Sequence, residues 1–533
     1  MITDWRILDI RCTIGRHVRL REGYPHSAAD LLNDMDHVGV AEAMVLDCLS
    51  QENHPAEGNA RVLKTTAGHP RLHPLWAALS PGAPEEQPGG PELLAAMHKH
   101  RVAALMLLPN QFKYSLHDWC IDELLEPLAA HRVPVIVCYD EVGGSNCDRT
   151  DWPQVVAMAK RWPTLPILVS EWRIRRSQRI LYRALEACQN LRIELSGYSL
   201  YRGIEYITRR WGAGRLVFGS YWPAYGQPQT LCTLLRAEID DDAKRLIAGD
   251  NMRKLMAWCD VEHPRVPPVE PADEYVAIGR GQPVRPELRF MDCHGHIGGH
   301  CLHYHVPDGE LDATVSEMDR QGVQEALVFS LAGVFGDEQY GNDLIAEAVR
   351  RYPQRFLGFT LVNPNHGRDA MLAELARGQA MGLRGVKLHA FGQHAPERGE
   401  LIELACRWAH EHRQFILNHN WGPPDWLEPL LAKYTDACFI CGHATRMYSD
   451  LMTRWANVYV CSCPLWDGPR DCEMTVAAIG ADRLLFGSDL QDLPIAWGTG
   501  PILYARIPPE QKRLILGENL RRLMQRYSLA ESS

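Results

Sequence analysis

Four segments in the second half of the chain place histidine or aspartate at the end of an apolar run. They are His294-Gly295-His296, His419, His443 and Asp489. Residues i and i+2 of a strand point to the same face, so both rings of the His-x-His pair can reach one ion. Neutral imidazole and carboxylate are usual ligands of zinc, manganese and iron. Each residue alone would read as a buried histidine or a helix cap, but together they predict one metal centre.

Further polar and aromatic residues near the same run ends are candidates for substrate contacts. These candidates are Lys387, His389, Arg446 and Trp421, with Trp466 as a further aromatic residue. The guanidinium of Arg446 could bind a substrate carboxylate through two hydrogen bonds, and Trp421 indicates an aromatic pocket wall. The loop after the His294-Gly295-His296 run, 299–305, contains three histidines. We expect it to form a lid or pocket wall rather than a second metal site.

Short apolar runs alternate with helix-like stretches through both halves of the chain. In the second half the runs are 289–294, 325–330, 356–362, 385–390, 415–419, 438–443, 458–462 and 484–489. In the first half they are 6–12, 42–49, 72–79, 102–108, 133–139, 166–172, 191–197 and 215–221. Alternation of this kind predicts βαβ units around a parallel sheet. Eight units in roughly 250 residues predict an α/β fold of two tandem (β/α)8 barrels, whose catalytic groups lie at the C-terminal ends of the strands.

Three segments of the second half recur in the first half in the same order, which predicts an internal duplication. The pairs are RILD and RFMD, RLVFGS and RLLFGS, and KRLIAGDN and KRLILGEN. Across this repeat every candidate ligand changes. Arg11 replaces His294, Thr13 replaces His296, Met106 replaces Lys387, Tyr139 replaces His419, Glu171 replaces His443 and Tyr221 replaces Asp489. The first half is therefore predicted to be a barrel that was kept as a scaffold and lacks the metal ligands.

Length and composition fit two globular domains and disfavour several kinds of partner. With 533 residues, the chain exceeds one hydrophobic core. A proline-rich segment, 263–287, predicts an extended linker between a first barrel, 1–262, and a second, 288–533. The net charge of −10 disfavours nucleic acid. No apolar run reaches the roughly 18 residues of a membrane span, and no signal peptide is recognisable, so we expect a cytoplasmic protein without membrane partners.

The second half resembles the amidohydrolase superfamily, specifically its amidohydrolase-2 group. The resemblance rests on MDCHGHIG, GLRGVKLHAFGQ, FILNHNWG, FICGHATR, LLFGSDLQDLP and LILGENLRRLM, which span nearly the whole half in family order. The group contains metal-dependent hydrolases and non-oxidative decarboxylases related to aminocarboxymuconate-semialdehyde and resorcylate decarboxylases. The pattern departs from the family at one point, because the family often has glycine soon after the strand-six histidine.

The resemblance implies a role for each candidate residue. The implied metal ligands are His294, His296, His419 and Asp489. His443 is implied as the catalytic histidine, and Asp489 as a second catalytic group that accepts a proton. One divalent ion per chain is implied, most simply Zn²⁺, with Mn²⁺ or Fe²⁺ as alternatives. In binuclear members of the wider superfamily a carboxylated lysine bridges two ions, so a second ion beside Lys387 stays open.

The leading functional prediction is hydrolysis of a small organic substrate at an amide, ester or lactone carbon by a metal-activated water. The first alternative is non-oxidative decarboxylation of an aromatic or unsaturated carboxylic acid. The second is a binding pseudoenzyme without catalysis.

For the first half, three roles are open: a fused cover for apolar surface, a ligand-binding domain, or a mimic of the second subunit of a dimer. Relatives in the group often dimerise and lend an arginine to the neighbouring site, and the segment 172–176 contains three arginines. We favour the dimer mimic. Further homo-oligomerisation is compatible with the sequence.

Overall fold

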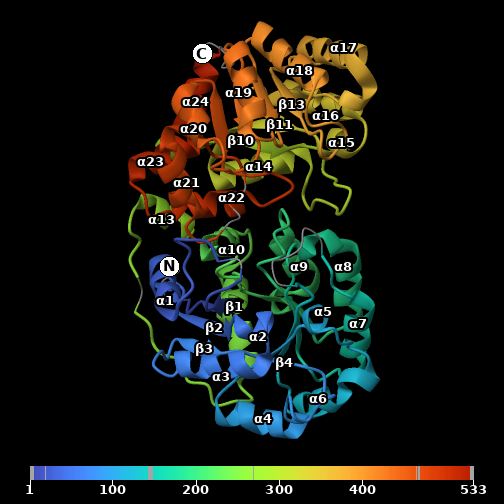
Figure 1. The fold of residues 1–533 in the computed structure, drawn as a ribbon, viewed down its shortest axis with the longest axis vertical. Helices are drawn as coiled ribbons and strands as arrows, with labels where there is room; N and C mark the ends of the chain where they lie inside the picture. The colour runs from blue at the N-terminus through green and yellow to red at the C-terminus, as the bar shows by residue number, and fades with distance from the viewer. Residues whose placement is uncertain are drawn as a thin grey trace. The chain divides into compact units, whose positions relative to one another are not determined.

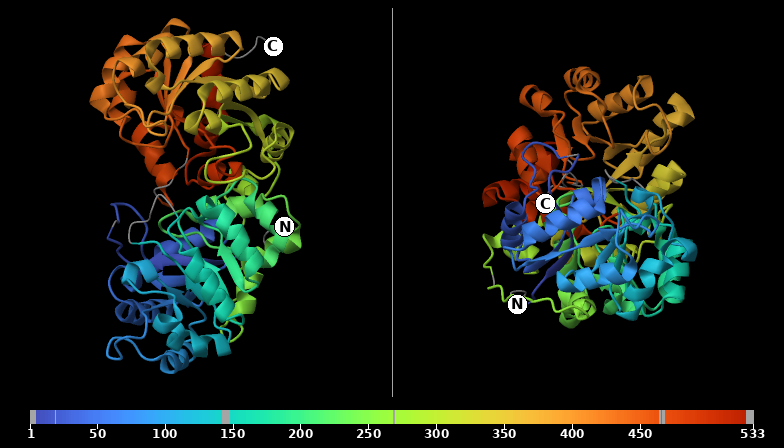
Figure 2. Two further views of the ribbon diagram at one scale, coloured as in Figure 1. Left: turned by 90° about the vertical axis from the view of Figure 1, so that its right-hand side faces the viewer. Right: turned by 60° about the horizontal axis from the view of Figure 1, so that its bottom comes forward.

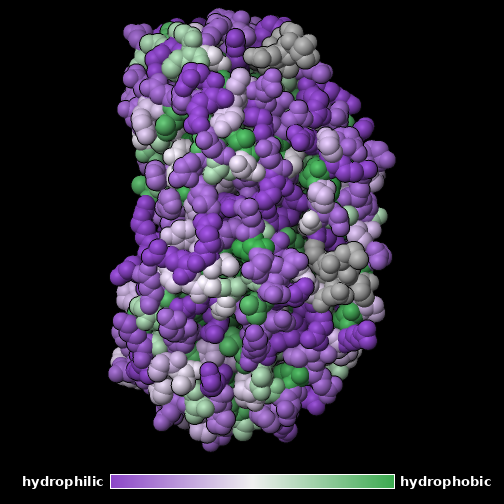
Figure 3. Space-filling view, turned by 180° about the vertical axis from the view of Figure 1, so that it is seen from behind, coloured by the Kyte–Doolittle hydropathy of each residue, from purple (hydrophilic) through white to green (hydrophobic). Residues whose placement is uncertain are grey.

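The computed structural model describes residues 5–18, 20–141, 148–267, 269–463, 465 and 468–527. The chain divides into two compact units, Met1–Ala272 with Asp467–Pro469 and Asp273–Trp466 with Arg470–Ser533 (Figure 1). On the face drawn in Figure 3, apolar residues lie in small separate groups among polar ones. None of the described helices combines the length and the apolar character needed to cross a membrane.

The second unit is a parallel eight-stranded barrel. Its strands are β10 (Phe290–His296), β11 (Val323–Phe329), β12 (Phe356–Leu361), β13 (Gly385–Leu388), β14 (Phe415–Asn418), β15 (Cys438–Cys441), β16 (Val458–Cys461) and β17 (Leu484–Leu485). Neighbours in the sheet follow chain order. The barrel closes where the amide of Cys293 donates to the carbonyl of Phe486 at 2.8 Å. This confirms the (β/α)8 prediction, and all eight expected strands are present.

Helices surround these strands (Figure 2). The larger ones are α14 (Leu311–Gln321), α16 (Glu338–Arg351), α17 (Gly367–Ala380), α18 (Glu400–Glu411), α19 (Pro424–Lys433), α20 (Ser449–Arg454), α21 (Asp471–Ile479), α22 (Ile495–Leu503) and α24 (Asn519–Arg526). The strands read as apolar runs because inner and outer faces are both covered. Phe359, Leu417 and Ile440, for example, are fully buried in one cluster.

The first unit repeats this architecture. Its strands are β1 (Leu8–Ile14), β2 (Glu42–Asp47), β3 (Leu72–Pro74), β4 (Trp76–Ala78), β5 (Leu105–Leu107), β6 (Val135–Val137), β7 (Ile167–Val169), β8 (Leu191–Glu194) and β9 (Leu216–Val217). β3 and β4 are two parts of the expected run 72–79, interrupted at Leu75. The amide of Ile10 donates to the carbonyl of Phe218 at 3.2 Å and joins the first strand to the last.

The helices of the first unit follow its strands in the same way. The larger ones are α1 (Ala28–Val38), α3 (Pro55–Thr66), α4 (Gly90–Lys99), α6 (Asp118–Ala130), α7 (Trp152–Arg161), α8 (Gln178–Ala187), α9 (Gly203–Trp211), α10 (Gln227–Leu235) and α12 (Asn251–Met256).

The two barrels share a buried hydrogen-bonded pair that fastens the first strand to the loop after the last. In the second barrel, the carboxylate of Asp292 accepts from the hydroxyl of Ser488 and, at 3.0 Å, from its amide. In the first, Asp9 accepts from the Ser220 hydroxyl at 2.6 Å and from its amide at 2.9 Å. Equal contacts at equal positions support the duplication.

A second shared feature lies near the end of each barrel. A π-helical turn covers Leu246–Asp250 in the first barrel and Leu514–Glu518 in the second. An asparagine follows each turn, and its side-chain amide donates to two backbone carbonyls. Asn251 donates at 2.9 Å to both Ala213 and Leu216. Asn519 makes the matching pair of bonds at 2.7 and 3.0 Å.

The predicted linker 263–287 is not extended throughout. Its later part forms the short helix α13 (Glu274–Gly279), which begins where the Asp273 side chain accepts from the amide of Val276. This stretch lacks proline, so nothing prevents a helical turn. The amine of Lys512 donates to Asp273 at 2.7 Å and fixes α13 to the second unit. The boundary between the units, after Ala272, therefore falls inside the predicted linker.

Candidate metal centre

Three of the predicted ligands converge at the C-terminal end of the second barrel. Nε2 of His296 donates to Oδ1 of Asp489 at 2.8 Å, and Nε2 of His294 lies 3.6 Å from the same oxygen. All three side chains are buried, and one ligand atom of each lies within 4.8 Å of the others. Nδ1 of His296 is buried with no hydrogen-bond partner in the described protein. Two imidazoles and a carboxylate that share one point form a set that suits a divalent ion.

The backbone holds these groups by means that the sequence supplies locally. Both histidines lie on β10, two residues apart. Asp489 follows β17 with a φ of 62°, the left-handed region that aspartate tolerates better than most residues. Its amide donates to the carbonyl of His294 at 2.9 Å. Asp292 also accepts from the amide of His294 at 3.0 Å, so one buried carboxylate positions both ligand segments.

The Asp489 carboxylate is anionic in this environment. Burial by itself would raise its pKa, but the hydrogen bond from His296 lowers the pKa well below the usual value. Burial lowers the pKa of His294, which favours the neutral imidazole that a metal requires. The residues present therefore fit a bound divalent cation.

His443 and His419 form a hydrogen-bonded pair beside this set. Nε2 of His443 lies 2.8 Å from Nδ1 of His419, and Nδ1 of His443 lies 2.9 Å from the carbonyl oxygen of Cys463. A carbonyl can only accept, so Nδ1 of His443 carries a proton. Burial lowers the pKa of His443 to about 4, so its ring is neutral and Nε2 accepts from His419. The Nε2 lone pair of His419 then remains for a ligand.

His443 contacts both His294 of the buried set and His419. The ring centroids of His294 and His443 are 5.6 Å apart, and those of His443 and His419 are 4.2 Å apart. The structure thus brings His294, His296 and Asp489 together, with His443 next to them. His419 is drawn to the same end of the barrel but is not part of the three-residue cluster.

Lys387 is buried without a hydrogen-bond partner for its amine in the described protein. The amine lies 4.0 Å from the ring centroid of Phe329. Burial lowers its pKa to about 7. His389, two residues on, stacks on His419 with ring centroids 4.0 Å apart. An unpartnered amine in this position is costly to the fold, which favours a role in ligand contact.

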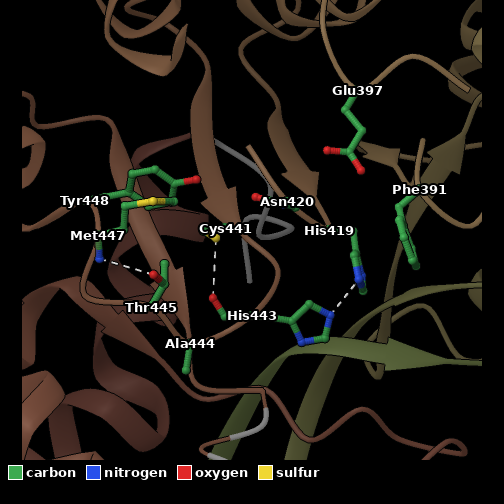
Figure 4. Close-up of a pocket in the computed structure, with 10 residues that line it drawn as sticks. All are labelled: Phe391, Glu397, His419, Asn420, Cys441, His443, Ala444, Thr445, Met447 and Tyr448. Carbon is green, nitrogen blue, oxygen red and sulfur yellow. Dashed lines mark hydrogen bonds between the residues drawn. The ribbon is translucent and has the colours of Figure 1, made fainter. Parts of the chain in front are cut away.

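A cavity of about 370 Å³ opens beside the histidine pair (Figure 4). Its wall contains Phe391, Glu397, His419, Asn420, Cys441, His443, Ala444, Thr445, Met447 and Tyr448. In Figure 4, Glu397 and Phe391 stand on one side and Thr445, Met447 and Tyr448 on the other, with the two imidazoles between them. Sequence reasoning missed Glu397, Phe391 and Met447, because they lie on loops whose path no strand pattern predicts.

Two predicted substrate contacts are not supported. Trp421 is fully buried, and its indole nitrogen donates to the carbonyl of Ile440 at 3.0 Å, so it belongs to the core. Arg446 donates from Nη1 to Asp471 at 2.6 Å and is absent from the cavity wall described above. Trp466 lies outside the described residues. The histidines of the loop 299–305 enter none of the metal-suited clusters of the described chain.

Two buried cysteines lie beside His294, and no pattern in the sequence connects them with it. Sγ of Cys461 lies 3.9 Å from Nδ1 of His294, and Cys463 completes a buried cluster with them. Nδ1 of His294 thus faces sulfur while Nε2 faces Asp489. In metal sites, a contact to the ring nitrogen that does not bind the ion orients the histidine, and Cys461 makes a contact of this kind with Nδ1 of His294.

The first barrel has other residues at the positions that match the candidate ligands. The strand register shows that one of the predicted matches, Tyr139 for His419, must be corrected. The amide of His419 donates to Leu388, the last residue of β13, and the amide of Cys138 donates to Leu107, the last residue of β5. Cys138 therefore matches His419, and the expected match to Tyr139 was wrong by one residue. In the arginine segment, Arg175 is buried and donates to the hydroxyl of Ser199 at 2.9 Å.

Both barrels match one protein family in sequence. The profile of the family described as amidohydrolase matches residues 19–257 and 291–525, which together make up most of the chain. The chain belongs to the amidohydrolase family. Each barrel of the chain matches the family separately, as the duplication requires. No curated protein matches the chain.

Several solved structures are similar to this chain. An uncharacterized TIM-barrel protein from Bordetella bronchiseptica is 16% identical with a TM-score of 0.38, over 47% of this chain and 98% of the other. A 5-carboxyvanillate decarboxylase from Sphingomonas paucimobilis is 14% identical with a TM-score of 0.35, over 45% and 99%. A probable 2-pyrone-4,6-dicarboxylic acid hydrolase from Acinetobacter baumannii is 16% identical with a TM-score of 0.35, over 44% and 99%.

Proposed function

We propose that the second barrel is a metal-dependent hydrolase of a small organic substrate with an amide, ester or lactone bond. The observation that carries this proposal is the convergence of His294, His296 and Asp489 next to a neutral His443. His419 would complete the ligand set through Nε2. One divalent ion in this barrel, most simply Zn²⁺, would supply Lewis acidity and lower the pKa of a bound water toward neutrality.

The residues of the chain would bind, orient and move protons around the reacting group. His443 has its Nδ1 proton fixed on the carbonyl of Cys463, so Nε2 is the atom that would take up and return a proton, once the hydrogen bond from His419 to it is broken. The carbonyl acceptor stabilises the charged ring while the proton is held. Lys387 would donate a hydrogen bond to an anionic or carbonyl oxygen of the substrate. In the described protein without substrate, its buried amine has no hydrogen-bond partner.

Non-oxidative decarboxylation of an unsaturated or aromatic acid is the second candidate. It is favoured by the apolar part of the cavity wall, Phe391, Met447 and Tyr448. A weakly polar surrounding disfavours a carboxylate more than the neutral product of the whole reaction. Loss of carbon dioxide leaves an electron pair on the substrate carbon, and a proton that Nε2 of His443 has taken up from solvent would be transferred to that carbon.

A substrate screen in ¹⁸O-labelled water tests the proposal against its alternative. We expect metal-dependent turnover in which one labelled oxygen appears in the product and no carbon dioxide is released. Release of carbon dioxide without label incorporation would assign the second candidate. Absence of turnover over a broad panel, with metal bound, would contradict both.

A further inference from the structure

We propose that the first barrel binds a divalent metal ion of its own, held by Cys138, Asp140 and Glu171. This inference goes beyond the proposed function, because the site lies in the other barrel and uses none of the family ligands. It also modifies the prediction that the first barrel is without metal: the histidine ligands are lost, but a different donor set has taken their place.

The three side chains converge at the C-terminal ends of two adjacent strands. Cys138 and Asp140 follow β6, and Glu171 follows β7. All three are fully buried, and one ligand atom of each lies within 4.8 Å of the others. Thiolate and carboxylate are common ligands in protein zinc sites. A mixed sulfur and oxygen set therefore favours zinc over the hard cations magnesium and calcium.

The donors stand where the second barrel has its histidine pair. Cys138 matches His419 through the backbone register described above. Val137 pairs with Val169 as Asn418 pairs with Cys441. Glu171 lies two residues after Val169, and His443 lies two residues after Cys441. The first barrel thus replaces two imidazoles by a thiol and a carboxylate, both of which can bind a cation.

Each carboxylate is oriented by one oxygen and leaves the other unpartnered. Oδ2 of Asp140 accepts from the Tyr221 hydroxyl at 2.9 Å and from the amide of Trp172 at 2.8 Å. Oε2 of Glu171 accepts from the amide of Tyr139 at 2.8 Å. Oδ1 of Asp140 and Oε1 of Glu171 are buried and receive no hydrogen bond from another group of the described protein. Burial and the neighbouring Asp140 raise the pKa of Glu171 well above its usual value, so without a cation the two carboxyl groups would share a proton, which a bound ion would displace. Buried polar atoms without a partner are costly, and a shared cation would satisfy both oxygens.

Arg11 adjusts the charge of this cluster. It occupies the position of His294 and is buried. Its Nη2 lies 3.9 Å from Sγ of Cys138, and its Cζ lies 4.2 Å above the Tyr221 ring. Burial raises the pKa of the Cys138 thiol well above its usual value, and the nearby Arg11 guanidinium partly opposes this rise. With an ion bound, a thiolate and two carboxylates would carry three negative charges, which one guanidinium and one divalent cation balance.

Metal analysis of full-length variants tests the proposal. In the His294→Ala/His296→Ala chain, purified without chelator and supplied with Zn²⁺, plasma mass spectrometry should find about one ion per chain. Adding Cys138→Ser or Glu171→Gln should remove that ion, whereas Cys259→Ser, at a buried cysteine of the same barrel outside the cluster, should keep it. Loss of the ion in the His294→Ala/His296→Ala chain itself would overturn the proposal.

A cobalt spectrum provides a second reading that identifies the sulfur ligand. The His294→Ala/His296→Ala chain loaded with Co²⁺ should show a thiolate-to-cobalt charge-transfer band that the added Cys138→Ser change abolishes, which separates Cys138 from Cys461 and Cys463 of the second barrel. A cobalt-loaded chain without this band would overturn the proposal. The outcome is separable from the proposed function, which concerns the ion that the His294→Ala/His296→Ala change removes from the wild-type protein.

Discussion

At the scale of single residues, the candidate site combines two groups whose buried environments set their protonation. His443 is held neutral, with its Nδ1 proton directed to the Cys463 carbonyl. Lys387 keeps an amine in the interior with no hydrogen-bond partner in the described protein. Nε2 of His443 is the atom that can accept a proton. A ligand that pairs with the Lys387 amine would offset the free-energy cost of burying that amine.

Replacement of His443 by asparagine should separate catalysis from metal binding. We expect turnover to fall by about 10²–10⁴-fold, the usual contribution of a general acid–base group. Metal content should stay unchanged, since the buried set of His294, His296 and Asp489 is intact. Comparison of kcat with the ion content of the same preparation checks this. A loss of the ion together with activity would instead make His443 a ligand.

Replacement of Lys387 by methionine should stabilise the protein while it impairs activity. Methionine fills a similar volume without a polar atom, so we expect a gain of about 1–3 kcal/mol at neutral pH or below. The folded chain releases the Lys387 proton near pH 7, whereas an unfolded lysine keeps it to about 10.5. Wild-type stability therefore rises with pH across this interval, and the advantage of the variant shrinks.

Urea unfolding of the chelated protein at several pH values checks this expectation. Lys160→Met, at an exposed position of the first barrel, is the control and should change stability little. A Lys387→Met chain that is less stable than wild type at pH 6 would contradict the account.

At the scale of elements, the ends of the strands position the candidate ligands. The sequence predicts these strand ends because each apolar run stops at a polar residue. His294, His296 and Asp489 were predictable for this reason. Contacts between segments were not. The burial of Trp421 and the pairing of Arg446 with Asp471 depend on how loops pack. The one-residue error at Cys138 arose because β6 spans three residues, too few for a pattern to fix its end.

The pair of Asp292 and Ser488 should matter for metal affinity although neither residue binds the ion. Ser488→Ala removes a hydroxyl that holds the loop carrying Asp489. Such contacts behind metal ligands commonly contribute about 10–100-fold in affinity. We expect a loss of that size in Zn²⁺ affinity, measured by competition with a chromophoric chelator. Ser220→Ala removes the matching bond to Asp9 in the first barrel and should leave the affinity of the second barrel unchanged.

At the scale of the whole molecule, the two barrels share one framework but differ in the side chains at the C-terminal ends of their strands. The first barrel also has a buried network that the second lacks among its described residues. The carboxylate of Glu42 accepts from His73 at 2.8 Å, from His263 at 2.6 Å and from Arg253 at 2.6 Å. His263 is the first residue of the predicted linker, so this network attaches the linker to the barrel that precedes it.

Replacement of Glu42 by glutamine should destabilise the first barrel. The change keeps an acceptor oxygen but removes the buried negative charge that a part-buried guanidinium and two imidazoles share, at a cost of about 3–5 kcal/mol. Calorimetry should show a lower unfolding temperature, and hydrogen exchange should place the loss in β1, β2 and α12. Glu325→Gln, at the matching, half-buried position of the second barrel, is the control. An equal effect of both changes would contradict a special role of this network.

We have proposed that His294, His296 and Asp489 hold a catalytic divalent ion in the second barrel. The most direct measurement is the metal content of the wild-type chain and of the His294→Ala/His296→Ala chain, purified side by side and analysed by plasma mass spectrometry. We predict that the variant carries one ion fewer per chain, keeps its fold and loses turnover. Equal metal content in the two chains would contradict the claim.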